Sequence, residues 1–439
     1  MISSSRRIVV TGAGVITPLG KTPAALWAAL TSGRSGVGPL RAVPTDYLPT
    51  SFAAEAHDFT GSIDDFGPLE GEKKKALRKG LKVMCRECQM GLAAAQQALH
   101  AAGHSGGGAD PERIGVVFGS DYMLTLPDDF TASVIRCRGE NGLFDFGRWA
   151  SEGMPQITPL WLLKYLPNMP ASHLAIYNDL RGPNNSITLR EASANLALGE
   201  AYRTIARGHA DIMVAGATGT RVHPMKLVHT LMQEEVAGNG TSPTTASRPF
   251  DLNRNGMVLG EGAAALVIEE LETAKARGAK IHGEIIGTAS GTVVDRRGVA
   301  HRGQALANVM RATLRDAGAT VDDVGHIHAH GLSTRSSDTE EAWAIHEVFG
   351  PLAGQIPVIA AKSYFGNLGA ASGLVELISS LSAFEHGRLF PVLNYETPDP
   401  ACRLNVVTGA DVPPGDTVLN LSFTPQGQAS AVLVRSYQD

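Results

Sequence analysis

The sequence contains few cysteines, no long apolar run and little net charge, and each of these absences excludes a class of protein. Four cysteines in 439 residues are too few for a disulfide-stapled secreted fold. No stretch approaches the ~18 consecutive apolar residues of a transmembrane helix. The apolar part of the N-terminus, residues 8–10, is too short for a signal peptide. We therefore expect a cytoplasmic protein that does not associate with membranes.

The charge balance argues against a partner that is a polyanion. The chain has 38 basic and 43 acidic residues, for a net charge of -5, so we expect no nucleic-acid binding. Hydrophobic residues make up 43% and charged residues 18%, which is typical of a globular protein and not of a disordered one. The length fits about three domains of ~150 residues or one elaborate α/β enzyme.

The hydrophobic pattern predicts strands that alternate with helices. Apolar, β-branched runs predict strands at 8–15, 114–118, 211–215, 263–270, 280–288, 327–330, 358–361, 418–422 and 431–434. Helical periodicity is found at 23–32, 73–102, 192–208, 304–317, 337–348 and 370–386. This alternation favours parallel βαβ units with helices on the sheet faces.

Two short motifs raise the question of a cofactor. Gly12-Ala13-Gly14 is interpreted as a glycine-rich turn after the first strand, but Thr17 stands where a dinucleotide fingerprint requires its third glycine. Cys85 and Cys88 form a single C-x-x-C pair without a second pair of ligands, so we interpret them as core residues of a helix. The sequence predicts neither a cofactor nor a metal.

Three features bear on organisation. The helix predicted at 73–102 begins with a basic run, which is either a solvated face or a docking patch for an acidic partner. Residues 130–177 are irregular and rich in aromatic residues, which favours a cap or interface insertion near 120–180. We place the boundary between two halves, 1–272 and 273–439, in the polar stretch after the strand at 263–270.

Several segments together resemble the β-ketoacyl synthases, the condensing enzymes of fatty-acid and polyketide assembly. The resemblance rests on RIVVTGAGVITPLG at 7–20, RPFD at 248–251 with NRNGMVLGEGA at 253–263, AHGLST at 329–334, KS at 362–363 with Gly366, and NLSF at 420–423. They follow the family's order over nearly the whole chain. The resemblance implies a thiolase-like α/β fold of five layers, α-β-α-β-α, built from two similar halves and normally dimeric.

The resemblance also implies a Cys-His-His site, and this chain departs from it at two positions. In the family, the Cys is acylated from an acyl carrier protein or CoA, malonyl carrier protein is decarboxylated, and two histidines donate to the oxygen that becomes an enolate. His330 matches the first histidine. Glu191 stands at the nucleophile position, and Asn367 stands at the second histidine.

Other residues are expected to support this site. Lys362, Asp338 and Glu341 match family positions that are expected to act by ion pairing, and Phe423 precedes the loop that gates the nucleophile in the family. That loop reads TPQG at 424–427, without the family's run of glycines.

The two replacements change what the site can do. A carboxylate acylated in place of a thiolate gives an anhydride that is prone to hydrolysis, so we expect no ordinary condensation at Glu191. An ionised Glu191 about 4 Å from a malonyl carboxylate repels it by ~4 kcal/mol at an effective dielectric near 20. Protonation of a buried Glu191 would remove that repulsion. Asn367 keeps a hydrogen-bond donor but cannot titrate near neutral pH.

These considerations predict a β-ketoacyl synthase homologue that acts as a chain-length-factor-like partner subunit. One alternative is an acyltransferase or malonyl-carrier-protein decarboxylase that uses His330, Asn367 and a protonated Glu191. Another is a non-catalytic dimer that binds carrier protein or acyl chains. The expected partners are an acyl carrier protein with its acyl or malonyl groups and a second subunit, identical or competent in catalysis. In the family, basic residues meet the carrier protein, so the docking candidates here are Lys74, Lys75, Arg78 and Lys79.

Overall fold

The computed structural model of the protein describes residues 6–104 and 109–437. Within them, eleven strands follow one another in a single hydrogen-bonded order, β11-β10-β9-β12-β13-β8-β1-β7-β6-β4-β5. The strands are β1 Ile8–Ile16, β4 Ile114–Ser120, β5 Asn184–Thr188, β6 Ile212–Thr220, β7 Glu261–Glu270, β8 Gly283–Thr292, β9 His326–His328, β10 Pro357–Ile359, β11 Asn405–Val406, β12 Thr417–Phe423 and β13 Gln428–Arg435. A separate small sheet pairs β2 Gly38–Pro39 with β3 Phe52–Ala53.

The strand order repeats between the two halves of the chain. Strands β5-β4-β6-β7-β1 and β10-β9-β12-β13-β8 follow the same topology, and the halves meet where β1 pairs with β8. The expectation of parallel strands holds for β5-β4-β6 and for β11-β10-β9-β12. It is wrong for β7, β1, β8 and β13, which pair antiparallel. The physical reason is clear at β12–β13, because a short turn at 424–427 can only join antiparallel neighbours.

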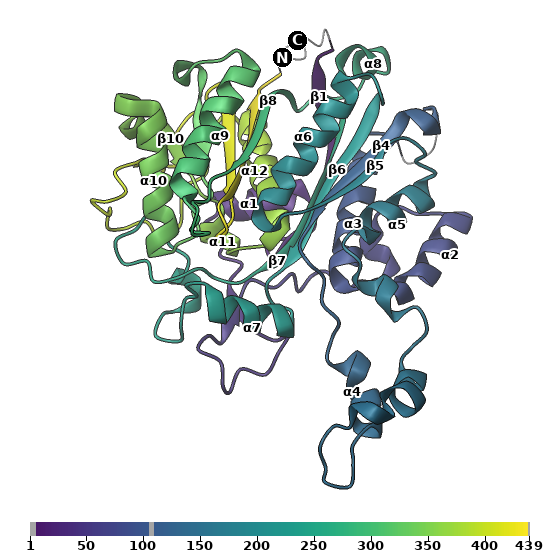
Figure 1. Ribbon diagram of the computed structural model, residues 1–439. Coiled ribbons are helices and arrows are strands. Elements are labelled where there is room, and N and C mark those ends of the chain that lie inside the picture. The colour runs from purple at the N-terminus through teal and green to yellow at the C-terminus, as the bar shows by residue number, and fades with distance from the viewer. Residues whose placement is uncertain (1–5, 105–108, 438–439) are drawn as a thin grey trace.

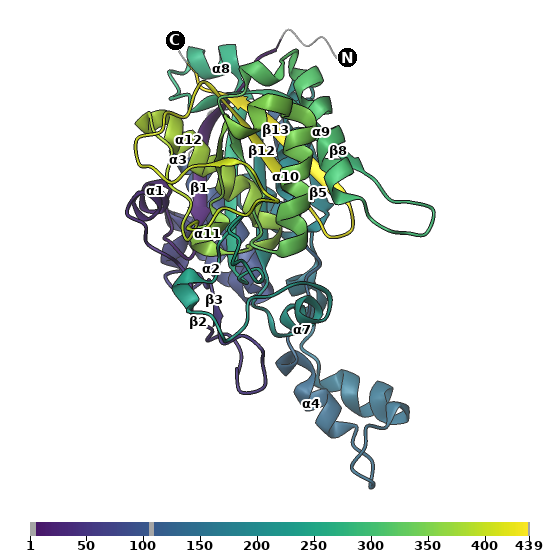
Figure 2. The same ribbon diagram turned by 90° about the vertical axis from the view of Figure 1, so that its left-hand side faces the viewer.

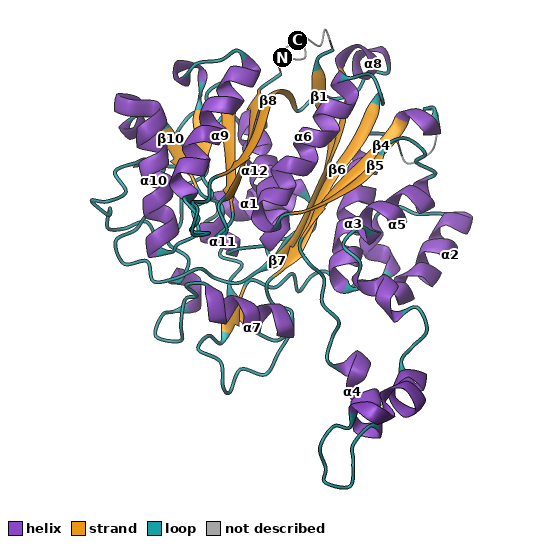
Figure 3. Ribbon diagram, viewed as in Figure 1, coloured by secondary structure: helices purple, strands orange, loops and turns teal. Residues whose placement is uncertain are grey.

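Helices cover both outer faces and fill the space between the two halves (Figures 1 and 3). Helix α3 packs on β1, β7 and β6, and α9 packs on β8 and β13. The helices are α1 Pro23–Thr31, α2 Gly71–Gly80, α3 Arg86–Ala101, α4 Asp128–Arg136, α5 Met169–Asn178, α6 Ser193–Ala206, α7 Pro224–Gln233, α8 Leu271–Ala276, α9 Arg302–Ala317, α10 Arg335–Phe349, α11 Lys362–Phe365 and α12 Ser372–His386. Across the described ranges, none of them is long and apolar enough to cross a membrane.

The middle layer consists of α6 and α12. Helix α6 contacts β4 and β6 of the first half and β8 and β13 of the second, while α12 contacts β7, β12 and α6. Every residue of 372–383 in α12 is buried, as expected of a helix that has sheet or helix on all sides. This confirms the five-layered α-β-α-β-α fold that the resemblance implied.

The glycines at 12 and 14 lie inside β1 and do not form the predicted turn. A Cβ at Gly12 or Gly14 would overlap backbone atoms of Ala98 and Ala94 on α3. The two glycines therefore allow α3 to approach the strand closely, which is a packing role and not a phosphate-binding one.

The prediction of one long helix at 73–102 is wrong, because this segment forms two helices, α2 and α3. Residue Met84 has an extended backbone with φ -123° and ψ 126°. The backbone N–H of Cys85 donates to the carbonyl oxygen of Lys164 at 3.3 Å instead of to its own helix. Gly80, the last residue of α2, packs so closely on Tyr177 of α5 that a Cβ there would overlap the Tyr177 hydroxyl. Helical periodicity alone does not reveal a break that a distant segment imposes.

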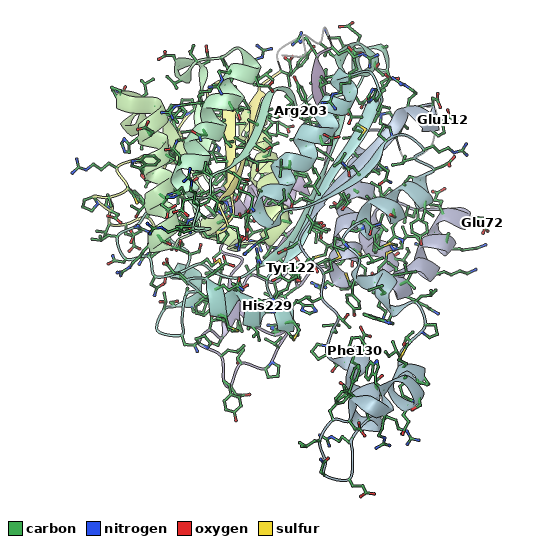
Figure 4. The ribbon with its side chains drawn as sticks, viewed as in Figure 1. Glu72, Glu112, Tyr122, Phe130, Arg203 and His229 are labelled. Carbon is green, nitrogen blue, oxygen red and sulfur yellow. The ribbon has the colours of Figure 1, made fainter. Side chains whose placement is uncertain are left out.

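The segment predicted as an insertion forms an arm, residues 126–166, that extends from the body in both Figure 1 and Figure 2. It carries α4 and is held internally by an edge-to-face contact of Phe130 and Trp161, with ring centroids 4.9 Å apart. Phe130 is labelled in Figure 4. Other apolar side chains of the arm face solvent, and Phe146 is 75% exposed.

Candidate active site

Glu191 lies in a tight turn between the edge strand β5 and the central helix α6. Arg190, the residue before it, has a left-handed backbone with φ 50°, a conformation that a non-glycine residue adopts only when its surroundings impose it. The Ser193 hydroxyl accepts a hydrogen bond from the backbone N–H of Leu189 at 2.7 Å and donates to the carbonyl oxygen of Ser120 at 2.9 Å. These bonds hold the turn and direct the Glu191 side chain into the interior.

The Glu191 carboxylate is buried, with 1% of its surface exposed, and is surrounded by donors. Its Oε1 accepts hydrogen bonds from the Arg221 guanidinium and from Nδ2 of Asn367, the latter at 3.1 Å. Its Oε2 lies 3.4 Å from Nε of Arg190. The structure therefore brings Glu191 and Asn367 into direct contact, as the resemblance requires of two residues in one site.

The charges around Glu191 oppose the protonated form that one alternative required. Burial by itself raises the pKa of Glu191, but Arg190 and Arg221 outweigh burial, so the pKa falls well below its usual range. Asp121 lies 3.2 Å from Arg221 and Glu234 pairs with Arg190. Neither arginine loses its proton, because the neighbouring carboxylates offset the cost of burying these cations. Glu191 is thus a carboxylate held by two cations.

His330 follows β9 and is positioned by the buried ammonium of Lys362. Lys362 Nζ donates to the His330 carbonyl oxygen at 2.8 Å, lies 3.2 Å from His330 Nδ1 and forms an ion pair with Glu376. Burial and the adjacent Lys362 hold the pKa of His330 well below its usual value. A neutral ring that accepts at Nδ1 carries its proton on Nε2. His330 thus keeps the form that can donate to a substrate oxygen.

Asp338 and Glu341 support the His330 loop through backbone hydrogen bonds, and Asp338 also forms an ion pair of the expected kind, with Arg254 at 3.7 Å. Glu341 accepts from the backbone N–H groups of His330 and Gly331 at 2.6 and 2.8 Å. Asp338 accepts from the backbone N–H groups of Leu332 and Phe250 at 3.0 and 2.9 Å. Burial raises the pKa of Asp338 to about 6 and that of Glu341 to about 8. The backbone N–H groups of this buried loop have no partners in a helix or sheet, and the two carboxylates supply the hydrogen-bond acceptors that they need.

Phe423 and the 424–427 turn lie beside the same cluster. The Phe423 ring packs on the His330 ring with centroids 4.6 Å apart. In the turn, the Gln426 side chain accepts from Arg190 at 3.4 Å, so this loop is tied to the Glu191 turn. Gly427 has φ 87°, which suits glycine.

A cavity of about 980 Å³ lies elsewhere, between the start of α3, the root of the arm and the start of α7. We call it the α3–α7 cavity. Its lining includes Thr220 and Val222 but none of Glu191, His330 and Asn367. Arg221, between the two lining residues, is fully buried and faces Glu191. Its ion pairs therefore lie behind the cavity wall. In the part of the chain that the structure describes, no group of three or more His, Cys, Asp or Glu side chains is arranged to hold a metal ion.

The four docking candidates all lie on α2. Lys75, Arg78 and Lys79 are exposed and Lys74 is partly exposed. Lys74 lies 3.1 Å from Asp64 and Lys75 lies 2.8 Å from Glu72. The predicted basic run does not continue as one face, because its last member, Arg86, belongs to α3 and pairs with Glu261 at 2.7 Å.

The charged partners of Glu191 were not among the residues predicted from the sequence. Arg221 is a single charge directly after the buried strand β6, and Arg190 is the immediate neighbour of Glu191. A charged residue at the end of an otherwise buried strand is a signal that sequence reasoning can use. Asp121, Glu234 and Glu376 had no comparable signal, since their pairing depends on which elements meet in the fold.

Comparisons with known proteins find similarity over nearly the whole chain. Sequence profiles of the β-ketoacyl synthase N-terminal and C-terminal domains match residues 5–274 and 282–396. A 3-oxoacyl-[acyl-carrier-protein] synthase 2 from Synechocystis sp. is 32% identical, over 99% of both chains. One chain from the structure of a type II polyketide-synthase acyl-carrier protein in complex with its ketosynthase superposes on this chain with a TM-score of 0.83 at 26% sequence identity. A chain of the ishigamide ketosynthase/chain length factor gives a TM-score of 0.80 at 26% identity. Each match covers 99% of this chain and 100% of the other.

One family assignment follows from the two profiles and from the near-complete overlap with these relatives. The five-layered architecture of two similar halves agrees with it. The two profiles together span most of the chain, in the order in which the two halves of the sheet occur. The chain belongs to the β-ketoacyl synthase family of fatty-acid or polyketide biosynthesis.

Proposed function

We propose that this protein is a chain-length-factor-like partner subunit that does not condense acyl groups by itself. The observation that carries the proposal is the buried Glu191 carboxylate, which Arg190, Arg221 and Asn367 hold in the turn before α6. The resemblance aligns this turn with the nucleophile position of the family. Similarity to the ishigamide ketosynthase/chain length factor, 26% identical over nearly the whole chain, supports the same assignment.

The contacts of Glu191 explain why the site is unsuited to acyl transfer. Oε1 of Glu191 accepts two hydrogen bonds, one of them from a guanidinium, and Oε2 lies 3.4 Å from Nε of Arg190. Positive charge beside both oxygens makes the carboxylate a weak nucleophile. Its ionisation is favoured so strongly that it is a weak base as well. The donor of Asn367, which could have met a substrate oxygen, is directed at Glu191. These contacts hold Glu191 and Asn367 to each other, while Nε2 of His330 stays available as a donor for a substrate.

The decarboxylase alternative loses its main support with the protonated form of Glu191. An ionised carboxylate at the nucleophile position opposes the approach of a malonyl carboxylate, and the carboxylates of Asp121 and Glu234 already occupy the flanking guanidinium groups. We therefore expect no release of carbon dioxide from malonyl carrier protein.

The experiment is an assay of the purified full-length chain with acyl and malonyl carrier proteins. Wild type should form neither a covalent acyl adduct, by intact-mass spectrometry, nor a condensation product. Adding a relative that retains Cys and both histidines should give a stable complex and change the length of its product. Condensation by wild type alone contradicts the proposal, as does carbon dioxide release that the Glu191→Ala variant abolishes.

A second candidate function, carrier-protein or acyl-chain binding without catalysis, is favoured by the α3–α7 cavity and by α2. The cavity is lined largely by apolar side chains such as Leu124, Leu227 and Val228. Reversing charge at Lys74 and Arg78 should weaken binding of the acidic carrier protein about tenfold at low salt, with less effect at high salt. The matched reversal at exposed Arg297 should leave binding unchanged. Equal affinities for all variants would contradict docking on α2.

A further inference from the structure

Two cysteine thiols meet at the N-terminus of α3, and the proposed function gives neither of them a role. Cys85 is the residue that caps α3, and Cys88 lies in the first turn. Their Sγ atoms are 3.6 Å apart, and both cysteines are free. The C-x-x-C pattern predicted two core residues; of the two, Cys88 is buried in the core and Cys85 is only partly buried.

The two sulfur atoms differ in accessibility. Cys88 is fully buried, with Met123 Sδ at 3.7 Å and the Lys164 carbonyl oxygen at 3.7 Å. Cys85 is only partly buried and lines the α3–α7 cavity. A reagent that enters this cavity of about 980 Å³ meets Cys85 first and finds Cys88 directly behind it.

We propose that Cys85 and Cys88 form a redox-active dithiol, which closes to an intramolecular disulfide by exchange with a low-molecular-weight disulfide that enters the α3–α7 cavity. The Cys85 thiol loses its proton and attacks one sulfur of the incoming disulfide, which releases one thiol. The Cys88 thiol then loses its proton and attacks Sγ of Cys85, which releases the second thiol. The protein gives up two electrons and two protons, and the small disulfide is reduced to two thiols.

The order of the two steps follows from the structure. Cys85 is the sulfur that lines the α3–α7 cavity, so an incoming disulfide reaches it first. The hydrogen bond between the two thiols and the burial of Cys88 raise the pKa of Cys88 well above the usual value. Cys88 therefore remains a thiol until Cys85 has reacted. C-x-x-C pairs at helix N-termini are known to cycle between dithiol and disulfide.

Disulfide formation changes the cavity wall. The sulfur atoms, 3.6 Å apart in the dithiol, approach to about 2.05 Å in a disulfide. Because Cys88 is enclosed by Met123 and the 164 carbonyl, it is the Cys85 side chain that moves, away from the cavity. The cavity therefore differs between the reduced and oxidised states.

The remaining cysteines provide internal controls. Cys137 and Cys402 are buried and lie in other parts of the fold, at the end of α4 and in the loop before β11. Only the pair at the start of α3 should respond to a small disulfide under native conditions.

The test uses the full-length reduced protein and glutathione disulfide. Wild type should lose two of its four titratable thiols without retaining glutathione, and dithiothreitol should restore both. Trypsin cleaves after Arg86, between the two cysteines, so peptides 83–86 and 87–113 should stay joined only in the oxidised protein. Cys88→Ser should stop at one glutathione bound to Cys85, and Cys85→Ser should react at least tenfold more slowly than wild type.

Three outcomes would overturn the proposal. These are four free thiols in wild type after prolonged exposure, oxidation of Cys85→Ser at the wild-type rate, and absence of the mixed disulfide in Cys88→Ser. The Cys137→Ser/Cys402→Ser control should oxidise like wild type, and melting curves of the reduced proteins should establish that each variant is folded. The tryptic experiment on wild type is independent of any variant, so the proposal stays falsifiable if a substitution prevents folding.

Discussion

Replacing Glu191 by glutamine tests the central feature of the site, a buried carboxylate shared between two guanidinium groups. The substitution keeps the size of the side chain and removes its charge. Arg221, fully buried, would then retain Asp121 at 3.2 Å as its carboxylate partner. We expect the protein to lose stability, because Arg221 is left with less compensation for its burial.

The magnitude follows from the contacts that are lost. Removing one member of a buried ion pair typically costs ~3–5 kcal/mol. Asp121 stays on Arg221 and Glu234 stays on Arg190, so the free energy of unfolding at pH 7 should fall by about 3 kcal/mol, near the lower limit.

The pH dependence has a definite sign. The pKa of Glu191 is lower in the folded protein than in the unfolded chain, so its contribution is fully present above the unfolded pKa of ~4.3. The difference between wild type and Glu191→Gln should be constant from about pH 7 to pH 5 and should shrink as the pH falls below ~4.3.

Urea unfolding followed by tryptophan fluorescence at pH 7 and at pH 3.5 measures both effects. Glu72→Gln is the matched control, because Glu72 lies on the surface, where Figure 4 labels it, and pairs with exposed Lys75. This control should be indistinguishable from wild type. Equal stability of wild type and Glu191→Gln at pH 7, or a difference that does not shrink at low pH, would refute the reasoning.

Three further predictions concern the second half of the protein and the chemistry of the site. Ser380→Ala should lower the free energy of unfolding by ~1–3 kcal/mol, because the Ser380 hydroxyl lies 3.1 Å from His326 Nε2 and 2.9 Å from His328 Nδ1. The Ser379 hydroxyl bonds only within its own helix, so Ser379→Ala should cost clearly less in the same urea experiment. Equal losses would contradict this assignment. Burial lowers the pKa of His326 to about 4, so its neutral form stabilises the fold fully above pH ~6.5. This contribution, about 3 kcal/mol, disappears as the pH falls from ~6.5 to ~4. A His326→Gln variant should therefore lose less stability over that pH range, and a pH dependence equal to that of wild type would argue against a buried neutral histidine. Glu191→Cys should gain a covalent acyl adduct by intact-mass spectrometry, and adding Asn367→His should raise the condensation rate above that of the single variant; the same rate in both would show that position 367 does not limit the chemistry.

The sequence predicted most of the architecture because alternation and periodicity are local signals. Helices were expected within about two residues of their observed ends at 302–317 and 335–349. The failures occurred where distant segments decide the outcome. Glycines 12 and 14 stay inside β1 because α3 packs on them, and the helix predicted at 73–102 is interrupted where Cys85 bonds to the backbone of Lys164. The antiparallel strands were missed because pairing direction depends on connections and not on composition.

For the candidate site, the sequence predicted that Glu191, His330 and Asn367 belong together, since the motifs around them can be aligned with the family without coordinates. Only the tertiary structure decided what those side chains are chemically. Glu191 is a carboxylate because Arg221, from the end of β6, reaches it, and His330 is neutral with its proton on Nε2 because Lys362 occupies its other face. Charge and tautomer depend on burial and on neighbours from other elements, and neither is written in a local pattern.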